Sequence, residues 1–449
     1  MINAGGAMDS FFYGRKHELN QLNGLIRAGT GGCALICGRG GVGKTALLRE
    51  LIRQNPEFHF RIFSVPRGGY PPEEENGLRD VFLHAGVSNE ILLIDQAENL
   101  DETQILRLLS ETAEGKTTAV FSGMISERMT EILTGRRSPV REQFAVKIGL
   151  GDFSWWNIKP FLKAAGITDP NGILPLTPYA VSGGNPKILN AFLRTVSENG
   201  VMTRLDSSLI KEPFYRMDSF AQENAPYYRI MQVISGGDDR MSSIAERLGM
   251  ATTSLPKYLN ILVENGLILR ENPVTEKYRQ NSRNGRYVIP DPWLRFWFRA
   301  IYPNMGEIEC LMGEGIPDIV SEIMKEKQIP EVYEEICRSS LWSMSEKCFD
   351  YDRVGRWWNR GSIRIPIVAY RSDGTDILFG LTSSNPERKM DVSDQKELEK
   401  SAAKVDWKPK SGSRREHYIL FSEGGFTGEM KEYAKKKENV ILVDSLPGK

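Results

Sequence analysis

Residues 33–52 constrain the fold of this chain more than any other stretch, because they read as a strand, a glycine-rich turn and a helix in that order. Residues 33–37 form an apolar run that predicts a buried strand. The residues that follow, GRGGVGKT at 38–45, match the pattern G-x-x-x-x-G-K-[ST] and lead into an amphipathic helix. An ordinary glycine turn is the alternative. The Lys-Thr pair and the correct flanks favour a phosphate-binding loop (P-loop) in an α/β fold with a parallel sheet.

The residue types of this P-loop suit a nucleoside triphosphate that carries Mg²⁺. Glycines let backbone N–H groups turn inward and form a nest for anions, and the helix N-terminus adds partial positive charge. Lys44 would reach the β- and γ-phosphates as a point charge, and Thr45 would offer a hydroxyl to Mg²⁺. The residues expected to bind ATP here are Gly38, Gly40, Gly41, Val42, Gly43, Lys44, Thr45 and Ala46.

A second apolar run, ILLID at residues 91–95, predicts a buried strand that ends in Asp95. An aspartate in that place holds Mg²⁺ directly or through water. Its alternative role is to cap the following helix. Gln96 comes next, where a glutamate would polarise the attacking water, and Glu98 is nearby but out of register. Glutamine can orient a water without acting as a base, so we expect ATP binding with slow hydrolysis.

Three further runs, at residues 59–65, 117–122 and 144–150, complete a predicted sheet of five strands. Ser122 ends one of them and either reads the γ-phosphate or closes a plain turn. Arg136, in a loop with a second arginine, either faces a γ-phosphate, in cis or from a neighbouring copy, or is solvated. The candidate catalytic residues are Lys44, Asp95, Gln96 and Arg136.

Net charge and cysteine usage narrow the choice of partners and compartment. The 449 residues predict two to four domains, and their 58 Lys and Arg balance 58 Asp and Glu. A bulk attraction to nucleic acid is therefore absent, although a local basic face stays open. The five cysteines lack metal-like spacing, which fits a reducing compartment. No apolar run approaches the ~20 residues of a membrane helix, and no signal pattern is present. We expect a cytoplasmic protein without a membrane partner.

The pattern changes twice behind the predicted sheet. Residues 151–225 read as helices, interrupted where Gly183-Gly184 and Pro186 break helical hydrogen bonds. Residues 226–300 follow a winged helix-turn-helix order, with a basic wing at 276–286. The presumed recognition helix carries one basic residue, Lys257, so contact with DNA and a purely internal packing role both stay open.

These landmarks together resemble one family, the archaeal-type ATPases of the AAA+/STAND-like P-loop NTPases, across nearly the whole chain. The resemblance implies an ATPase core at 1–150, a helical lid at 151–225, a winged helix at 226–300 and a restriction-endonuclease-like α/β domain at 301–449. It also implies that the segment with Arg15 covers the adenine; a helix cap with a solvated arginine is the alternative. The helix break before Pro186 itself predicts a turn packed near the nucleotide, and a plain loop between two helices is compatible with it. The matching residues are Tyr13-Gly14-Arg15, the P-loop, Asp95, Gly135-Arg136, Gly183-Gly184-x-Pro186, Lys257-Tyr258-Leu259 and Asp291-Pro292-x-Leu294-Arg295-Phe296-Trp297.

The chain departs from the family pattern in the PD-(D/E)xK nuclease-like tail. Such proteins carry Glu-Ile-Asp after a Trp-Trp pair and then Gly-Glu-x-Lys. Here residues 364–366 read RIP and residues 380–383 read GLTS. Metal-dependent cleavage needs clustered carboxylates, and only Glu334 fits an acidic position. We expect this domain to keep the fold without cleaving DNA.

The sequence thus predicts an ATP- and Mg²⁺-binding switch ATPase of low turnover whose nucleotide state reaches the winged helix and the tail. Two alternatives stay open: a DNA-binding regulator in which ATP only sets the conformation, and an ATP-gated nuclease. Expected partners are ATP, DNA through the winged helix, and another protein or a second copy of this chain.

Overall fold

The computed structural model describes residues 12–66, 84, 90–115, 117–124, 140, 142–165, 176–194, 209–211, 213, 217, 225–276, 282, 284–311, 318–345, 348–410, 412–444 and 446. The chain divides into two compact units, which are described separately below. Unit 1 comprises Met1–Thr168 and Gly184–Asn190, and unit 2 comprises Asp169–Gly183 and Ala191–Lys449. No helix within the described residues is both long enough and apolar enough to cross a bilayer.

Unit 1 is built on a five-stranded sheet in the order β2-β3-β4-β1-β5. Every neighbouring pair of strands is parallel. The central strands β1, β3 and β4 are buried on both faces, as is usual in parallel sheets. The prediction of a five-stranded parallel α/β sheet is therefore confirmed. The strands are β1 (Gly32–Gly38), β2 (His59–Ser64), β3 (Glu90–Asp95), β4 (Thr118–Met124) and β5 (Phe144–Leu150).

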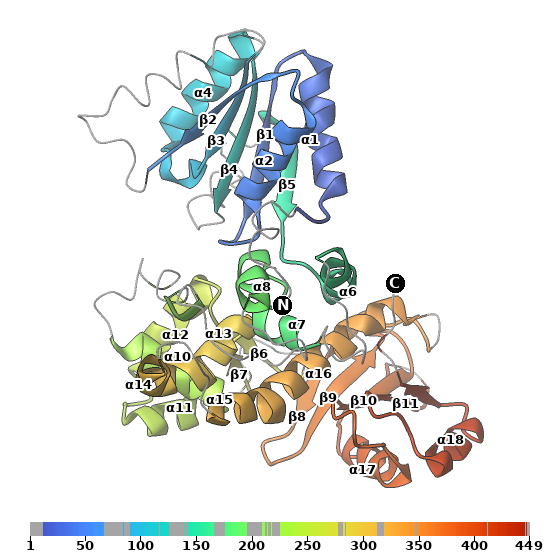
Figure 1. Cartoon of the computed structure of the whole chain (residues 1–449). Coiled ribbons are helices and arrows are strands. Elements are labelled where there is room, and N and C mark those ends of the chain that lie inside the picture. Colours follow the sequence, from blue (N-terminus) through green and yellow to red (C-terminus); the bar gives the residue numbers. More distant parts are fainter. Residues whose placement is uncertain are drawn as a thin grey trace. The chain divides into compact units, whose positions relative to one another are not determined.

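Helices cover both faces of this sheet, as Figure 1 shows. Helices α1 (Lys16–Ala28) and α2 (Lys44–Gln54) bury leucines against one face. On the opposite face lie the short helix η2 (Ala97–Asn99) and α4 (Glu102–Gly115), which packs Leu108 against the strands. This doubly covered sheet places the P-loop between β1 and α2, at the carboxyl end of the strands.

The segment after β5 returns to the P-loop end of unit 1. Helix α6 (Trp155–Ala164) begins shortly after β5, and the first residues of α8 (Pro186–Leu193) also belong to unit 1. The Phe153 backbone N–H donates to the Gly184 carbonyl at 2.8 Å, which ties these two stretches together.

Unit 2 begins with helices and a small hairpin. Strands β6 (Leu269–Glu271) and β7 (Arg286–Val288) pair antiparallel after α11 and α12. The aromatic side chains of Trp293, Phe296, Trp297 and Phe298 are fully buried and form part of the core of this unit. The helices, shown in Figure 1, are α7 (Leu176–Ser182), α10 (Ala225–Gly236), α11 (Met241–Leu248), α12 (Leu255–Glu264), α13 (Pro292–Phe296), η3 (Trp297–Ile301), α14 (Met305–Cys310), α15 (Asp318–Ile323), η5 (Met324–Gln328) and α16 (Ile329–Ser340).

A second sheet of five strands, in the order β12-β11-β10-β9-β8, completes unit 2. Strands β8, β9 and β10 are antiparallel neighbours, whereas β10, β11 and β12 run parallel. Helices α17 (Val392–Ala402) and α18 (Gly428–Lys435) pack on one face, and α16 packs on the other. The strands are β8 (Arg353–Trp358), β9 (Arg364–Tyr370), β10 (Asp376–Ser383), β11 (Arg415–Ser422) and β12 (Val440–Val443).

Candidate functional site

The glycines of the P-loop adopt backbone shapes that other residues resist. Gly41 has a φ of 78° and Gly43 a φ of 94°, both in the left-handed region. A Cβ on Gly38 would lie 2.5 Å from the Leu150 carbonyl oxygen, so this position has no room for a side chain. Val42, between the two left-handed glycines, is 1% exposed and anchors the loop in the core. The loop is therefore fixed by packing and by glycine together.

The Lys44 ammonium is folded back onto its own loop. Its Nζ donates to the carbonyl oxygens of Gly38 at 2.8 Å and of Arg39 at 3.0 Å. Burial lowers the pKa of Lys44 below its ordinary value, and the charges of Glu98 and Asp95 oppose that shift. Neutral carbonyls are weaker partners for an ammonium group than a phosphate is, so an entering anion can replace them.

Thr45 and Asp95 meet where α2 begins and β3 ends. The Thr45 hydroxyl donates to Asp95 Oδ2 at 2.8 Å, and Asp95 Oδ1 accepts from the Gln96 N–H at 3.0 Å. A hydroxyl and a carboxylate are oxygen ligands of the kind Mg²⁺ prefers. In the part of the chain that the structure describes, no group of three or more His, Cys, Asp or Glu could hold a metal ion. The pair therefore fits a Mg²⁺ that keeps water and phosphate oxygens as its other ligands.

Gln96 and Glu98, which follow Asp95 in the chain, have different surroundings. Gln96 is exposed and has a φ of 58°, a left-handed backbone that is uncommon for a residue other than glycine. This turn leads into η2, where the half-buried Glu98 accepts from the Met124 N–H at 2.9 Å. The Glu98 charge also acts on Lys44. Glu98 thus lies closer to the P-loop environment than its sequence position indicates.

The other predicted site residues, Arg15, Ser122 and Arg136, belong to different parts of the chain. Arg15, just before α1, donates to the Gly151 carbonyl, and its guanidinium lies 4.9 Å from the centre of the Phe153 ring. Burial lowers the pKa of Arg15, partly offset by Glu18, its ion-pair partner at 3.5 Å. Ser122 is fully buried, and no described residue forms a hydrogen bond with its hydroxyl. Arg136 lies outside the described residues.

Sequence reasoning selected Pro186, but the residue before it contacts the P-loop. The Asn185 side-chain amide donates to the Gly40 carbonyl at 3.0 Å and to Asp152 Oδ1 at 2.9 Å. Asp152 also pairs with the Arg39 guanidinium, and a Cβ on Gly41 would lie 2.6 Å from Asn185 Oδ1. Asn185 and Asp152 therefore join the site. In the sequence, the polar Asn185 between Gly183-Gly184 and Pro186 is the feature that could have indicated this contact.

In unit 2, Glu334 is the residue that fits an acidic position of the nuclease-like pattern, and it lies in a cluster of ion pairs. Glu334 Oε1 lies 2.8 Å from Arg356 Nε, 2.8 Å from Arg364 Nη2 and 3.2 Å from Arg338 Nη1. The Glu334 side chain is 8% exposed, so these guanidinium groups supply its hydrogen bonds. A carboxylate engaged in this way presents little free oxygen to a metal ion.

Comparison with protein families gives two matches. Residues 34–143 match the ATPase family associated with various cellular activities (AAA). Residues 297–382 match DUF234, described as archaeal and bacterial proteins of unknown function. The chain carries an AAA ATPase domain. An uncharacterized protein of Methanocaldococcus jannaschii is 25% identical over 392 residues, which cover 82% of this chain and 86% of that protein.

Solved structures were also compared with the whole chain. The Aeropyrum pernix ORC2 protein in ADPNP and ADP complexes has a TM-score of 0.45 and 12% identity, covering 70% of this chain and 96% of that chain. The Thermotoga maritima RuvB Holliday junction branch migration motor has a TM-score of 0.35 and 16% identity, covering 64% and 92%. AMPPCP-bound DnaA from Aquifex aeolicus has a TM-score of 0.35 and 11% identity, covering 57% and 90%.

Proposed function

We propose that this protein is a Mg²⁺-dependent switch ATPase of low turnover. The observation that carries the proposal is the combination of a preformed glycine nest, a Lys44 ammonium held by two carbonyls of that nest, and the Thr45–Asp95 hydrogen bond. Backbone N–H groups at the start of α2 would bind the phosphates together with Lys44. These features suit a triphosphate and need no rearrangement of the sheet.

Each residue of the site has a distinct part in this proposal. Lys44 exchanges its two carbonyls for β- and γ-phosphate oxygens, and Thr45 and Asp95 hold Mg²⁺, directly or through water. Bound Mg²⁺ neutralises charge that develops on the transferred phosphoryl group. Arg15 stays assigned to the adenine side, and Arg136 to the γ-phosphate.

Slow hydrolysis follows from the residue that succeeds Asp95. Gln96 can orient a water but cannot accept its proton, and its side chain is exposed. Glu98 can accept a proton, but the Met124 N–H holds one of its oxygens at 2.9 Å. We therefore assign Gln96 to water positioning.

The nucleotide state is proposed to act through the stretch at 184–190. Asn185 bonds to Gly40 O, and the Lys187 N–H donates to Gly41 O at 3.1 Å, so this stretch would sense any movement of the P-loop. The same helix, α8, continues along the chain into residues assigned to unit 2. In this proposal residues 151–225 act as the lid of an ATPase core at 1–150.

We further propose that residues 301–449 keep a nuclease-like fold without cleavage. The element order α16-β8-β9-β10-α17-β11 supports the fold, and the arginines around Glu334 support the loss of cleavage. Mg²⁺-dependent nicking of DNA that survives Lys44→Ala but disappears in Glu334→Ala would instead favour the nuclease.

A nucleotide-binding and phosphate-release assay tests the proposed ATPase. Wild type, Lys44→Ala and Gln96→Glu are compared with ATP and Mg²⁺. We expect wild type to bind ATP and release phosphate slowly, Lys44→Ala to lose binding, and Gln96→Glu to turn over faster at unchanged affinity. Brisk turnover by wild type would contradict the assignment of Gln96, and binding unaffected by Lys44→Ala would contradict the site itself.

DNA binding is a second candidate, supported by the order α11, α12 and then the β6–β7 hairpin at 226–300, a winged helix-turn-helix arrangement. Arg286 of the wing pairs with Asp239 at 3.0 Å, so it is a poor choice for the test. Arg279 and Arg283 lie outside the described residues and remain the wing cations to vary. Binding that weakens with salt and is lost on changing both to Ala would support this function.

A further inference from the structure

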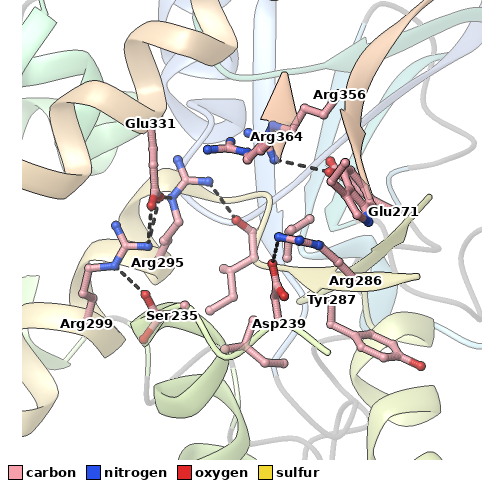
Figure 2. Close-up of a pocket in the computed structure, with 15 residues that line it drawn as sticks. Ser235, Asp239, Glu271, Arg286, Tyr287, Arg295, Arg299, Glu331, Arg356 and Arg364 are labelled. Atoms are coloured by element: carbon pink, nitrogen blue, oxygen red, sulfur yellow. Dashed lines mark hydrogen bonds and ion pairs between the residues drawn. The ribbon is translucent and has the colours of Figure 1, made fainter. Parts of the chain in front are cut away.

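A cavity of about 230 Å³ lies within unit 2, remote in sequence from the P-loop. Its walls come from the hairpin β6–β7, the helices α10, α13, η3 and α16, and the strands β8 and β9. Figure 2 shows that arginines from several of these elements gather around it. The charged residues that line it are Arg286, Arg295, Arg299, Arg356, Arg364, Asp239, Glu271 and Glu331. Glu334 and Glu335, which do not line it, pair with Arg356, Arg364 and Arg295, so the arginines are balanced in charge.

Several donors in this lining lack an acceptor. The buried atoms Arg286 Nε, Arg295 Nε and Arg299 Nη1 have no hydrogen-bond partner among the residues that the structure describes. The side chains of Arg295 and Arg299 are each 7% exposed, so bulk water does not solvate them freely. Among the described lining residues, all the unsatisfied side-chain atoms are donors. Leaving such groups buried and unpaired costs about 1–3 kcal/mol each, so the lining favours an acceptor.

The carboxylates around the cavity are shared between guanidinium groups. Glu331 accepts from Arg299 Nη2 at 2.9 Å and lies 3.4 Å from Arg295 Nε, without hydrogen-bond geometry to the latter. Glu335 accepts from Arg295 at 2.7 Å and from Arg356 at 3.2 Å. Each carboxylate therefore serves two arginines, and the acidic groups do not saturate the donors.

We propose that this cavity is a binding site for a small oxyanion, a phosphate or carboxylate group. Guanidinium forks match the geometry of both groups and bind them with two hydrogen bonds. The Arg286 guanidinium is oriented for this role by its bond to Asp239 and by the Trp358 ring, 4.9 Å away. The site is separate from the P-loop and does not depend on the proposed ATPase activity.

The size of the cavity limits the ligand. Its volume of about 230 Å³ is below the ~300 Å³ at which pockets for larger organic ligands begin. This volume suits inorganic phosphate or a small dicarboxylate better than a whole nucleotide. The rival explanation is that water alone completes an ion-pair network between the hairpin and the second sheet.

The experiment titrates the full chain with inorganic phosphate and, separately, with malonate, by calorimetry at constant ionic strength. The Lys44→Ala background weakens phosphate binding at the P-loop. In that background, Arg286→Gln and Arg364→Gln each remove a lining guanidinium, of which the second is 42% exposed and the safer to replace. Arg415→Gln is the matched control, because Arg415 is 68% exposed and pairs with Asp376 away from the cavity.

We expect saturable binding of at least one probe in Lys44→Ala, weakened about tenfold or more by Arg286→Gln or Arg364→Gln and unchanged by Arg415→Gln. The probe that binds more tightly identifies the class of ligand. If neither probe binds Lys44→Ala saturably, the proposal is overturned, whatever wild type binds through its P-loop. It is also overturned by binding that neither Arg286→Gln nor Arg364→Gln weakens. Loss of folding in one variant leaves the other to decide.

Discussion

The P-loop and the Glu334 cluster hold their charged groups in opposite ways. Lys44 in unit 1 is bound by two neutral carbonyls, whereas Glu334 in unit 2 is bound by three guanidinium groups. A charge held by carbonyls gains by meeting a ligand of opposite charge. A carboxylate already paired with arginines loses those pairs if a metal ion takes it. The P-loop is therefore arranged to receive a ligand, whereas the Glu334 cluster stabilises the fold of unit 2.

Replacing Glu334 should have the largest effect, and it tests whether the ion-pair cluster stabilises unit 2. Glu334→Gln removes the negative charge and one of the two acceptor oxygens shared by Arg338, Arg356 and Arg364, which weakens the pairing of these guanidinium groups. We expect a loss of about 3 kcal/mol of unfolding free energy for the transition of unit 2, measured by chemical denaturation. The control is Glu432→Gln, because Glu432 is exposed and its ion pair with Lys435 contributes little. Equal stability of Glu334→Gln and wild type would break the comparison.

The ligand-binding half is tested by Lys44→Ala. Loss of the ammonium removes charge-assisted hydrogen bonds to the phosphates, so the affinity for ATP–Mg²⁺ should fall about 100-fold. The stability of unit 1 should change little, because only two carbonyl contacts are lost. Anisotropy of a fluorescent ATP analogue measures the affinity. Lys159→Ala, which removes an exposed lysine of α6, is the matched control and should bind as wild type does.

Gln96→Glu adds a negative charge at an exposed position of the P-loop site, so it tests whether a base at this position speeds hydrolysis. We expect turnover to rise about tenfold while affinity stays the same, since a carboxylate can take the proton of the attacking water. Phosphate release under single-turnover conditions measures the rate. The paired variant Glu98→Gln should leave the rate within a few-fold of wild type. A collapse of turnover in Glu98→Gln alone would transfer the role of base from position 96 to position 98.

The smallest expected effect concerns the link between the P-loop and residues 184–190. Asn185→Ala removes hydrogen bonds to the neutral Gly40 carbonyl and to the Asp152 carboxylate, worth about 1 and about 2 kcal/mol. We expect ATP affinity to weaken about fivefold, measured with the same fluorescent analogue. Asn157→Ala, which removes a capping amide of α6, serves as a control for general loosening. An unchanged affinity in Asn185→Ala would mean that the contact only packs the chain.

The sheet of unit 1 could be predicted from the sequence because its central strands β1, β3 and β4 are mostly buried runs and the P-loop fixes their polarity, although the edge strands β2 and β5 are more polar. Strand β8 could not be predicted in this way. Its sequence RVGRWW lacks a clean alternation, since Arg356 turns toward Glu334 and Gly355 is packed against Val274. The side chains that β8 contacts, such as Val274 and Glu334, lie far from it in the sequence, so no local pattern predicts this strand.

The candidate site shows the same limit. The nest and the carboxylate at the end of β3 are local motifs and were predictable. Asn185 is 145 residues away from Gly40, so only the folded chain brings the two together. The return of Glu98 toward Lys44 depends on the left-handed backbone at Gln96, which no propensity assigns to glutamine. Tertiary contacts and one unusual backbone angle account for what the sequence missed.

The most direct test of the account is a thermal melt of the purified full chain with and without ATP and Mg²⁺. Because a ligand that binds only the folded state stabilises it, we predict a saturable rise in the melting temperature of the transition of unit 1 in wild type. The rise should be absent in Lys44→Ala and unaffected by Glu334→Gln in whatever folded protein that variant yields. No shift in wild type at millimolar ATP and Mg²⁺ would contradict the claim that the glycine nest and Lys44 bind a triphosphate.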